Sequence, residues 1–147
     1  MKTLLKISIL TVIAAVVWGC ESQRVITESQ LPATARTFIK THFPTATITT
    51  AMKEKDDLRT YYKAWLDNGF ELEFTKSGDW DDVEGYLQAV PESVLALIPA
   101  KIVQYCQISF PAATITEVNK ENYGYEIGLS NDIDIEFNKN GDIREID

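Results

Sequence analysis

The stretch FPTATIT at residues 43–49 returns almost unchanged as FPAATIT at residues 110–116. In each copy a phenylalanine and a proline separate an apolar segment with helical spacing from a segment with alternating apolar residues. Because proline cannot continue a helical hydrogen-bond ladder, Pro44 and Pro111 predict that a helix ends there and a strand begins. The two heptapeptides therefore predict the same helix-to-strand joint twice in one chain of 147 residues.

The similarity between the two halves extends well beyond the heptapeptide. An offset of 67 residues aligns 31–53 with 98–120 at nine identical positions, and an offset of 63 aligns 62–84 with 125–147 at eight. Alternating segments follow in each copy, bounded by the turn sequences DNG and KSGD in the first and SND and KNGD in the second. The predicted organisation is a first repeat at 31–84, a connecting segment with a short helix at 85–97, and a second repeat at 98–147.

These patterns predict an α+β fold built as a tandem repeat of an α-β-β-β unit, with antiparallel sheets and helices packed on one face. Two separate sheets and two sheets joined edge to edge are both compatible with the pattern. Side chains alternate between the two faces of a strand, so the apolar Leu72 and Phe74 are expected to face the helices. The same alternation places Tyr61, Lys63 and Trp65 on the open face. The corresponding positions of the second repeat carry glycine and glutamate, so the open face is expected to differ between the repeats.

The first 19 residues are predicted to be a secretory signal peptide, with two lysines ahead of a short apolar run at 7–18. That run is shorter than the roughly 20 residues of a membrane-spanning helix. The Gly-Cys pair that follows resembles the lipobox of bacterial lipoproteins, although Trp18 is bulkier than that pattern expects. The resemblance implies that Cys20 is lipidated, with residues 20–30 as a tether and membrane contact through the lipid anchor only. An ordinary secreted protein with a stray cysteine is the alternative.

The charge of the chain excludes one large class of partner. The net charge is −8, and removal of the signal peptide with its two lysines makes it −10. Such a surface repels phosphate backbones, and the sequence contains no basic stripe, so we exclude nucleic-acid binding. Lipidation of Cys20 would leave Cys106 as the only free thiol, and no intramolecular disulfide is expected.

The sequence offers little material for catalysis. His42 is the only histidine, which leaves no second histidine for a metal site or a proton relay. Cys106 aligns with Ile39 of the first repeat, which favours a buried apolar role over that of a nucleophile. The sequence also lacks a glycine-rich phosphate loop. We therefore predict a protein that is not an enzyme, with no catalytic residue, no metal-ligand set and no cofactor.

The repeated helix-to-strand joint and the hairpin pattern Y…L.NG.E..F.K.GDW resemble the PepSY-like group of bacterial periplasmic proteins, also described as beta-lactamase-inhibitor-like. The resemblance covers about residues 28–147. It implies a tandem repeat of sheet and helix, secreted or lipid-anchored, in the periplasm or at the outer membrane. It also implies a role in binding or inhibiting other proteins, sometimes linked to calcium, and it supplies no active site to transfer.

Aromatic residues on the open face are the strongest sign of a binding surface, because tryptophan and tyrosine dominate protein-binding hot spots. Two flanking glutamates favour a partner with basic groups. One tryptophan of the set, Trp80, has a core position as its alternative. The candidate protein-binding residues are Tyr61, Lys63, Trp65, Glu71, Glu73 and Trp80.

The predicted function is that of a cell-envelope lipoprotein that binds or inhibits an unknown envelope or secreted protein through the open face of its sheet. Two alternatives stay open. One is a structural envelope protein without a discrete ligand. The other is a calcium-responsive protein, because carboxylate oxygens follow the KSGD and KNGD turns and calcium prefers oxygen ligands. The carboxylates that would serve calcium are Asp79, Asp81, Asp82, Glu84, Asp142, Glu145 and Asp147.

Overall fold

The computed structural model describes residues 22–56 and 58–147, so the predicted signal peptide and Cys20 lie outside the described residues. The elements follow one another as β1 (Ser22–Ile26), the 3-10 helix η1 (Glu28–Gln30), α1 (Ala33–His42), β2 (Ile48–Lys55), β3 (Thr60–Leu66), β4 (Glu71–Thr75), β5 (Trp80–Glu84), α2 (Glu92–Leu95), α3 (Ala100–Ser109), β6 (Ile115–Glu121), β7 (Gly124–Leu129), β8 (Asp134–Asn138) and β9 (Ile143–Ile146). Both predicted joints are present, because α1 and α3 end directly before Phe43-Pro44 and Phe110-Pro111.

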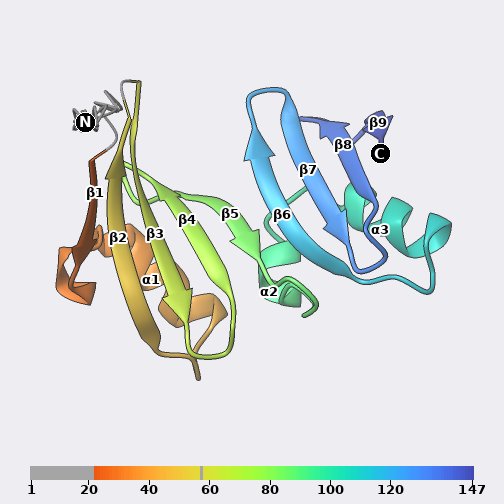
Figure 1. Cartoon of the computed structure of the whole chain (residues 1–147). Helices are drawn as coiled ribbons and strands as arrows, with labels where there is room; N and C mark the ends of the chain where they lie inside the picture. The colour runs from red at the N-terminus through yellow and green to blue at the C-terminus, as the bar shows by residue number, and fades with distance from the viewer. Residues whose placement is uncertain (1–21, 57) are drawn as a thin grey trace, which may run out of the picture.

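All strands belong to one antiparallel sheet whose spatial order, β1 to β9, is the order of the chain. The α+β class is therefore confirmed, but the two halves share a single nine-stranded sheet rather than forming separate sheets (Figure 1). They join where β5 pairs with β6, at Asp82 opposite Asn119, Val83 opposite Val118 and Glu84 opposite Glu117. We call this the β5–β6 seam.

The order of elements places one helix ahead of four strands in each half, α1 before β2–β5 and α3 before β6–β9. Each half thus has four strands after its helix instead of the three in the predicted α-β-β-β unit. The heptapeptide joints themselves predicted a strand at this point, and β2 and β6 begin there at Ile48 and Ile115, so the α-β-β-β description is one strand short.

Part of the segment predicted as a tether, 20–30, takes part in the sheet. Residues Ser22–Ile26 form β1, which pairs antiparallel with β2 from Ser22 opposite Lys55 to Ile26 opposite Ala51. This pairing supplies partners for backbone groups that β2 would otherwise present at a free edge. It also buries Ile26.

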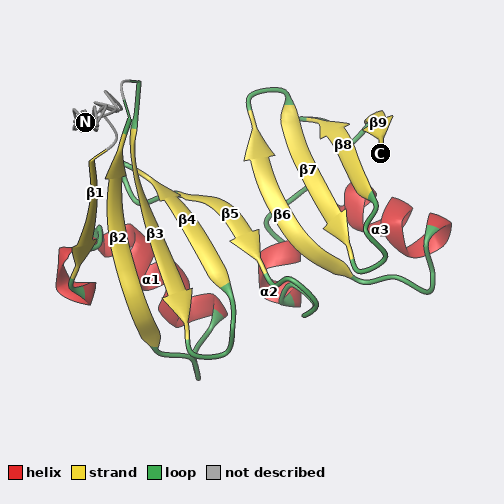
Figure 2. Ribbon diagram, in the orientation of Figure 1, coloured by secondary structure: helices red, strands yellow, loops and turns green. Residues whose placement is uncertain are grey.

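The helices lie on one face of the sheet, behind the strands in the view of Figure 2. Their buried side chains, including Phe38 and Ile102, form one core with strand residues such as Phe74, Ile127 and Phe137. Phe38 contacts Phe74 edge-on, with ring centroids 5.8 Å apart. The opposite face carries no helix in the described part of the chain. None of the described helices is long and apolar enough to cross a membrane.

Candidate functional site

The open face of the sheet carries two rows of side chains that run across the strands. Residues directly opposite one another on neighbouring strands lie close enough to interact, because the strands are about 4.8 Å apart. The first row is Trp65, Glu71, Glu84, Glu117, Gly128 and Asp134. The second row is Lys63, Glu73, Asp82, Asn119, Glu126, Glu136 and Glu145.

Two aromatic side chains are held in place by one carboxylate at the start of the first row. Trp65 donates from Nε1 to Oε2 of Glu71 at 3.0 Å, and the hydroxyl of Tyr86 donates to the same oxygen at 2.8 Å. The other oxygen of Glu71 lies 3.5 Å from Nζ of Lys63. Glu71 therefore organises the aromatic pair. Tyr86 is 57% exposed, with its backbone in the left-handed region at φ 58°.

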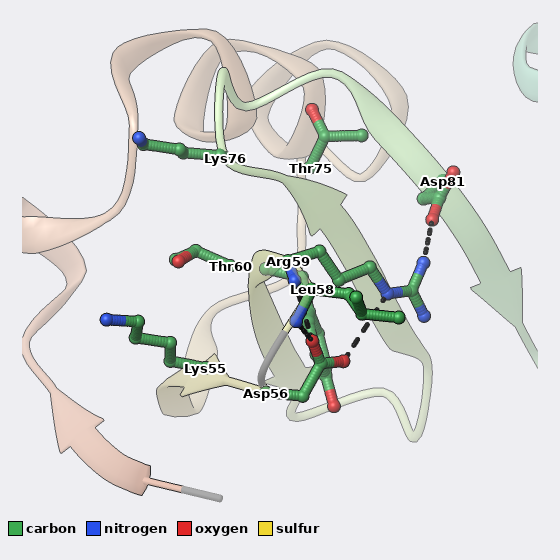
Figure 3. Close-up of a pocket in the computed structure, with 9 residues that line it drawn as sticks. Lys55, Asp56, Leu58, Arg59, Thr60, Thr75, Lys76 and Asp81 are labelled. Carbon is green, nitrogen blue, oxygen red and sulfur yellow. Dashed lines mark hydrogen bonds and ion pairs between the residues drawn. The ribbon is translucent and has the colours of Figure 1, made fainter. Parts of the chain in front are cut away.

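Glu73 in the second row is also engaged by cations. Nζ of Lys63 lies 3.5 Å from one oxygen of Glu73, and the guanidinium of Arg59 lies 3.7 Å from the other. Arg59 also approaches Asp56 at 3.8 Å and Asp81 at 3.6 Å, as the dashed lines in Figure 3 show. It lines a pocket of about 460 Å³ beside the β2–β3 turn.

The carboxylates of Asp82, Glu84 and Glu117 at the β5–β6 seam form no ion pair with the described residues, although Glu84 accepts a hydrogen bond from the backbone N–H of Tyr86 at 2.6 Å. Glu84 and Glu117 face each other directly, and Asp82 lies one row away on β5. Burial and the nearby charges of Asp82 and Glu84 raise the pKa of Glu117 to about 8. Burial and the charges of Glu84, Glu73 and Glu71 raise the pKa of Asp82 to about 7. At neutral pH the seam therefore holds protons that isolated carboxylates would have lost.

Asp82 is the most constrained member of this group. Its Oδ1 atom is buried and makes no hydrogen bond with the described residues. It lines a polar cavity of about 360 Å³ at the seam, together with Glu73 and Asn119 and with two cationic residues, Arg59 and Lys120. An unpaired buried carboxylate oxygen costs free energy, so a donor or a cation that entered this cavity would offset that cost.

Gly128 on β7 provides the space that the side chain of Glu117 occupies. A Cβ atom at Gly128 would lie 2.9 Å from Cβ and 3.1 Å from Oε2 of Glu117. The first distance is shorter than a Cβ atom normally approaches a neighbouring atom in proteins, so a larger residue at 128 would force Glu117 to move. The glycine of the second half thus allows Glu117 to lie flat over β7.

Trp80 does not belong to the open face, and its assignment to that surface is wrong. The pairing of β4 with β5 shifts between Glu73 and Phe74, which inserts Asp81 as an extra residue and places Trp80 opposite Phe74. The side chain therefore lies on the helix side, where it is only 9% exposed and stacks on Phe38 at 5.9 Å. Nζ of Lys120 lies 3.7 Å from the ring centroid.

The structure brings the other predicted residues together on the open face. Lys63, Trp65 and Glu71 form one contact group, Glu73 joins it through Lys63, and Tyr61 lies at its edge beneath Arg59, 5.0 Å from the ring centroid to the guanidinium carbon. All are partly buried.

Sequence reasoning missed Tyr86 and the role of Glu117. Tyr86 sits in a connecting segment without a periodic pattern. Glu117 aligns with Thr50 of the first half, and only the β5–β6 pairing places it against Glu84.

The acidic residues after the two turns do not gather into one site. Asp79 accepts a hydrogen bond from Ser77, and Asp142 pairs with Lys101 at the far end of the molecule. Asp81 pairs with Arg59. Within residues 22–56 and 58–147, no group of three or more histidine, cysteine, aspartate or glutamate side chains is placed to hold a metal ion.

His42 and Cys106, the residues considered as a base and as a nucleophile, lie in surroundings typical of structural residues. Nδ1 of His42 lies 2.9 Å from Oγ of Ser93, which links α1 to α2, and burial lowers the pKa of this histidine. Cys106 is buried, and burial raises the pKa of its thiol to about 11. A thiol with this pKa is a poor nucleophile at neutral pH.

Comparison with known families identifies the class of protein. The model of the family described as "Putative beta-lactamase-inhibitor-like, PepSY-like" matches residues 60–145, which is more than half of the chain. The chain therefore belongs to the PepSY-like family. None of the curated proteins matches it.

Three solved structures share the fold over nearly their full length. A "putative calcium-regulated periplasmic protein" from Bacteroides thetaiotaomicron is 32% identical, with a TM-score of 0.78 over 85% of this chain and 96% of that one. A "putative periplasmic protein" from Bacteroides vulgatus is 36% identical, with a TM-score of 0.79 over 88% and 99%. A second protein from Bacteroides vulgatus, also described as periplasmic, is 26% identical, with a TM-score of 0.80 over 86% and 99%.

Proposed function

We propose that this protein is a non-enzymatic periplasmic binding module whose open sheet face binds a basic segment of another envelope or secreted protein. The observation that carries the proposal is the group of carboxylates at the β5–β6 seam, Asp82, Glu84 and Glu117, which form no ion pair with the described residues. A lysine or arginine side chain placed there would relieve their mutual repulsion and satisfy the buried oxygen of Asp82.

The aromatic pair beside the seam supports a polypeptide as the partner. Trp65 and Tyr86 are oriented by Glu71, so little side-chain entropy would be lost when a partner contacts their rings. Both ring types also attract cations across their faces. A basic segment that crosses the first row would therefore meet aromatic rings at one end and carboxylates at the centre.

The cellular setting follows from the relatives and from the N-terminal sequence. The similar structures are described as periplasmic proteins, which supports the same location for this chain. Lipidation of Cys20 after removal of residues 1–19 would anchor the module at a membrane. We also infer that the two halves are tandem copies of one unit, since their element order and their sequence offsets agree.

A titration with a hexalysine peptide at low ionic strength and about pH 8.5 tests this function. We expect Trp65→Ala to weaken binding by about fivefold, and Glu84→Gln combined with Glu117→Gln to weaken it by about tenfold. Glu92→Gln removes one negative charge from α2, on the helix side, and serves as the control with little effect. Equal weakening per charge removed by Glu92→Gln and by the seam variants, with no effect of Trp65→Ala, would show that only net charge matters and would reject the face.

A calcium response is the second candidate function, favoured by the description of the relative at 32% identity as calcium-regulated. Among the carboxylates proposed for calcium, Asp82 and Glu84 lie at the seam, where Glu84 faces Glu117. Specific binding should raise the melting temperature by several degrees in about 5 mM calcium. A shift below about 1 °C, or the same shift in magnesium, would rule this candidate out.

A further inference from the structure

The last strand of each half pairs with its neighbour in the same register. Trp80 lies opposite Phe74 in the first half, and Ile143, which aligns with Trp80 at an offset of 63, lies opposite Phe137 in the second. Both pairings contain a β-bulge one residue before the phenylalanine. The β5 and β9 strands therefore present equivalent outer edges.

These equivalent edges differ in what covers them. The outer edge of β5 pairs with β6, and its inward side chains Trp80 and Val83 are 9% and 0% exposed. In the described part of the chain no strand pairs with the outer edge of β9. The counterparts Ile143 and Ile146 are 44% and 47% exposed.

A bulge and charged residues usually protect an edge strand from pairing. In this fold the bulge and the charged residues do not by themselves prevent pairing. The β5 strand has the same bulge and carries Asp81 and Asp82 at the positions of Arg144 and Glu145 in β9. Despite these features β5 accepts a neighbouring strand. The first half thus serves as an internal control for the second.

An apolar groove runs beside the same edge on the helix side. Its volume is about 380 Å³, and Tyr105, Ile108 and Ile143 line it. Ile108 is 80% exposed. The corresponding place in the first half is closed by the stacking of Phe38 on Trp80.

We propose that the outer edge of β9 and this groove bind an extended segment of a second protein, which adds to the sheet as an antiparallel tenth strand. Asp147 exchanges both of its backbone hydrogen bonds with Asp134. Because antiparallel partners alternate, the N–H and C=O groups of Ile146 point outward and are available to the added strand. The incoming residue opposite Ile146 would be apolar.

The charges of the edge define the partner's chemistry. Glu145 and Asp147 flank Ile146 on the open face, so the residues opposite them would be basic. A second copy of β9 fits poorly, since symmetric antiparallel pairing about Ile146 would oppose Glu145 to Asp147 of the other copy. The partner is therefore a segment that alternates β-branched apolar residues with lysine or arginine.

The experiment uses an octapeptide with blocked ends that alternates valine and lysine, titrated into ¹⁵N-labelled protein. We expect the largest shifts at β9 and at Tyr105 and Ile108. Ile146→Pro removes an outward N–H and leaves the inward ladder intact. This variant should weaken binding at least tenfold. Ile143→Glu should also weaken binding, and it serves as the second test if the proline variant is poorly folded. Trp65→Ala, on the open face, should leave binding at this edge unchanged.

Three results would overturn the proposal. The first is absence of shifts at β9. The second is an affinity for the β9 edge that Ile146→Pro and Ile143→Glu leave unchanged. The third is a concentration-dependent dimer of the free protein that Ile146→Pro dissociates, which would make a second copy the occupant. A peptide that alternates valine and glutamate should bind at least tenfold more weakly.

Discussion

Glu84 and Glu117 lie directly opposite each other across the β5–β6 seam, so the joint between the two halves places two carboxylates side by side. Burial and neighbouring negative charges raise the pKa of Glu117 to about 8 and the pKa of Asp82 to about 7. The seam is therefore the part of the molecule most sensitive to pH near neutrality.

Stability is predicted to fall as the pH rises through the pKa values of the seam. A carboxyl whose pKa is raised by folding stabilises the protein fully below its unfolded value, near 4, and loses that contribution as the pH rises through the folded value. Thermal unfolding at about pH 6.5 and about pH 9 covers the upper part of this loss for Asp82 and Glu117. His42, whose pKa burial lowers, contributes a smaller change of the opposite sign near the lower pH. We expect a lower melting temperature at the higher pH.

The variant Asp82→Asn checks the cause of this pH dependence. It should raise the free energy of unfolding at about pH 9 by on the order of 2 kcal/mol and flatten the pH dependence. Glu92→Gln should leave the slope as it is. A melting temperature that rises toward pH 9 would show that repulsion between the seam carboxylates does not lower stability. The same would follow if Asp82→Asn left the dependence of stability on pH unchanged.

Gly128→Ala is predicted to destabilise the protein by about 1–2 kcal/mol, because the added Cβ would meet the side chain of Glu117. Glu117→Gly combined with Gly128→Ala should lose little stability beyond Glu117→Gly alone, since glycine at 117 removes both the Cβ atom and the carboxylate that the new Cβ would meet. Urea denaturation of the two single variants and the double variant gives the coupling energy. Additive losses would mean that Glu117 does not lie over β7.

The two tryptophans are predicted to respond very differently to truncation. Trp80→Ala should cost about 3–5 kcal/mol, because it empties a core position that contacts Phe38. Trp65→Ala should cost less than about 1.5 kcal/mol, since that ring lies on the open face and loses chiefly one hydrogen bond to Glu71. Chemical denaturation measures both values. A larger loss of stability for Trp65→Ala than for Trp80→Ala would contradict the placement of Trp65 on the open face and Trp80 in the core.

Tyr86→Gly is predicted to be nearly neutral for stability, because glycine relieves about 1 kcal/mol of left-handed backbone strain while the hydrogen bond to Glu71 is lost. Tyr86→Phe keeps the strain and loses the bond, so it should be less stable by about 1 kcal/mol. Both should bind hexalysine more weakly than the wild type. A glycine variant with unchanged affinity would remove Tyr86 from the binding face.

Local patterns predicted the parts of the fold that depend on local chemistry. Proline disrupts a helix in any context, so Pro44 and Pro111 were enough to predict both joints. The alternation that placed Lys63 and Trp65 on the open face needs only a regular strand. Trp80 was misplaced because one extra residue, Asp81, reverses the alternation, and nothing in the sequence beside it signals a bulge.

The seam could not be predicted because it depends on the pairing of two distant segments. Asp82 and Glu84 are visible as acidic residues, but their counterpart Glu117 is 33 residues from Glu84 in the sequence. Only the pairing of β5 with β6 turns separate acidic residues into a partly buried group in which the pKa values of Asp82 and Glu117 are raised. Tyr86 was missed for a similar reason, since its hydrogen bond to Glu71 crosses 15 residues.

Proton release on binding tests the central proposal most directly. A lysine side chain at the seam should lower the pKa values of Asp82 and Glu117, so titration of hexalysine at about pH 7 in two buffers of different ionisation enthalpy should show release of about one proton. Affinity should rise by about tenfold from about pH 6 to about pH 8.5, and Asp82→Asn with Glu117→Gln should abolish both effects. Binding without proton release, with the same affinity at both pH values, would contradict the proposal that the seam receives the basic partner.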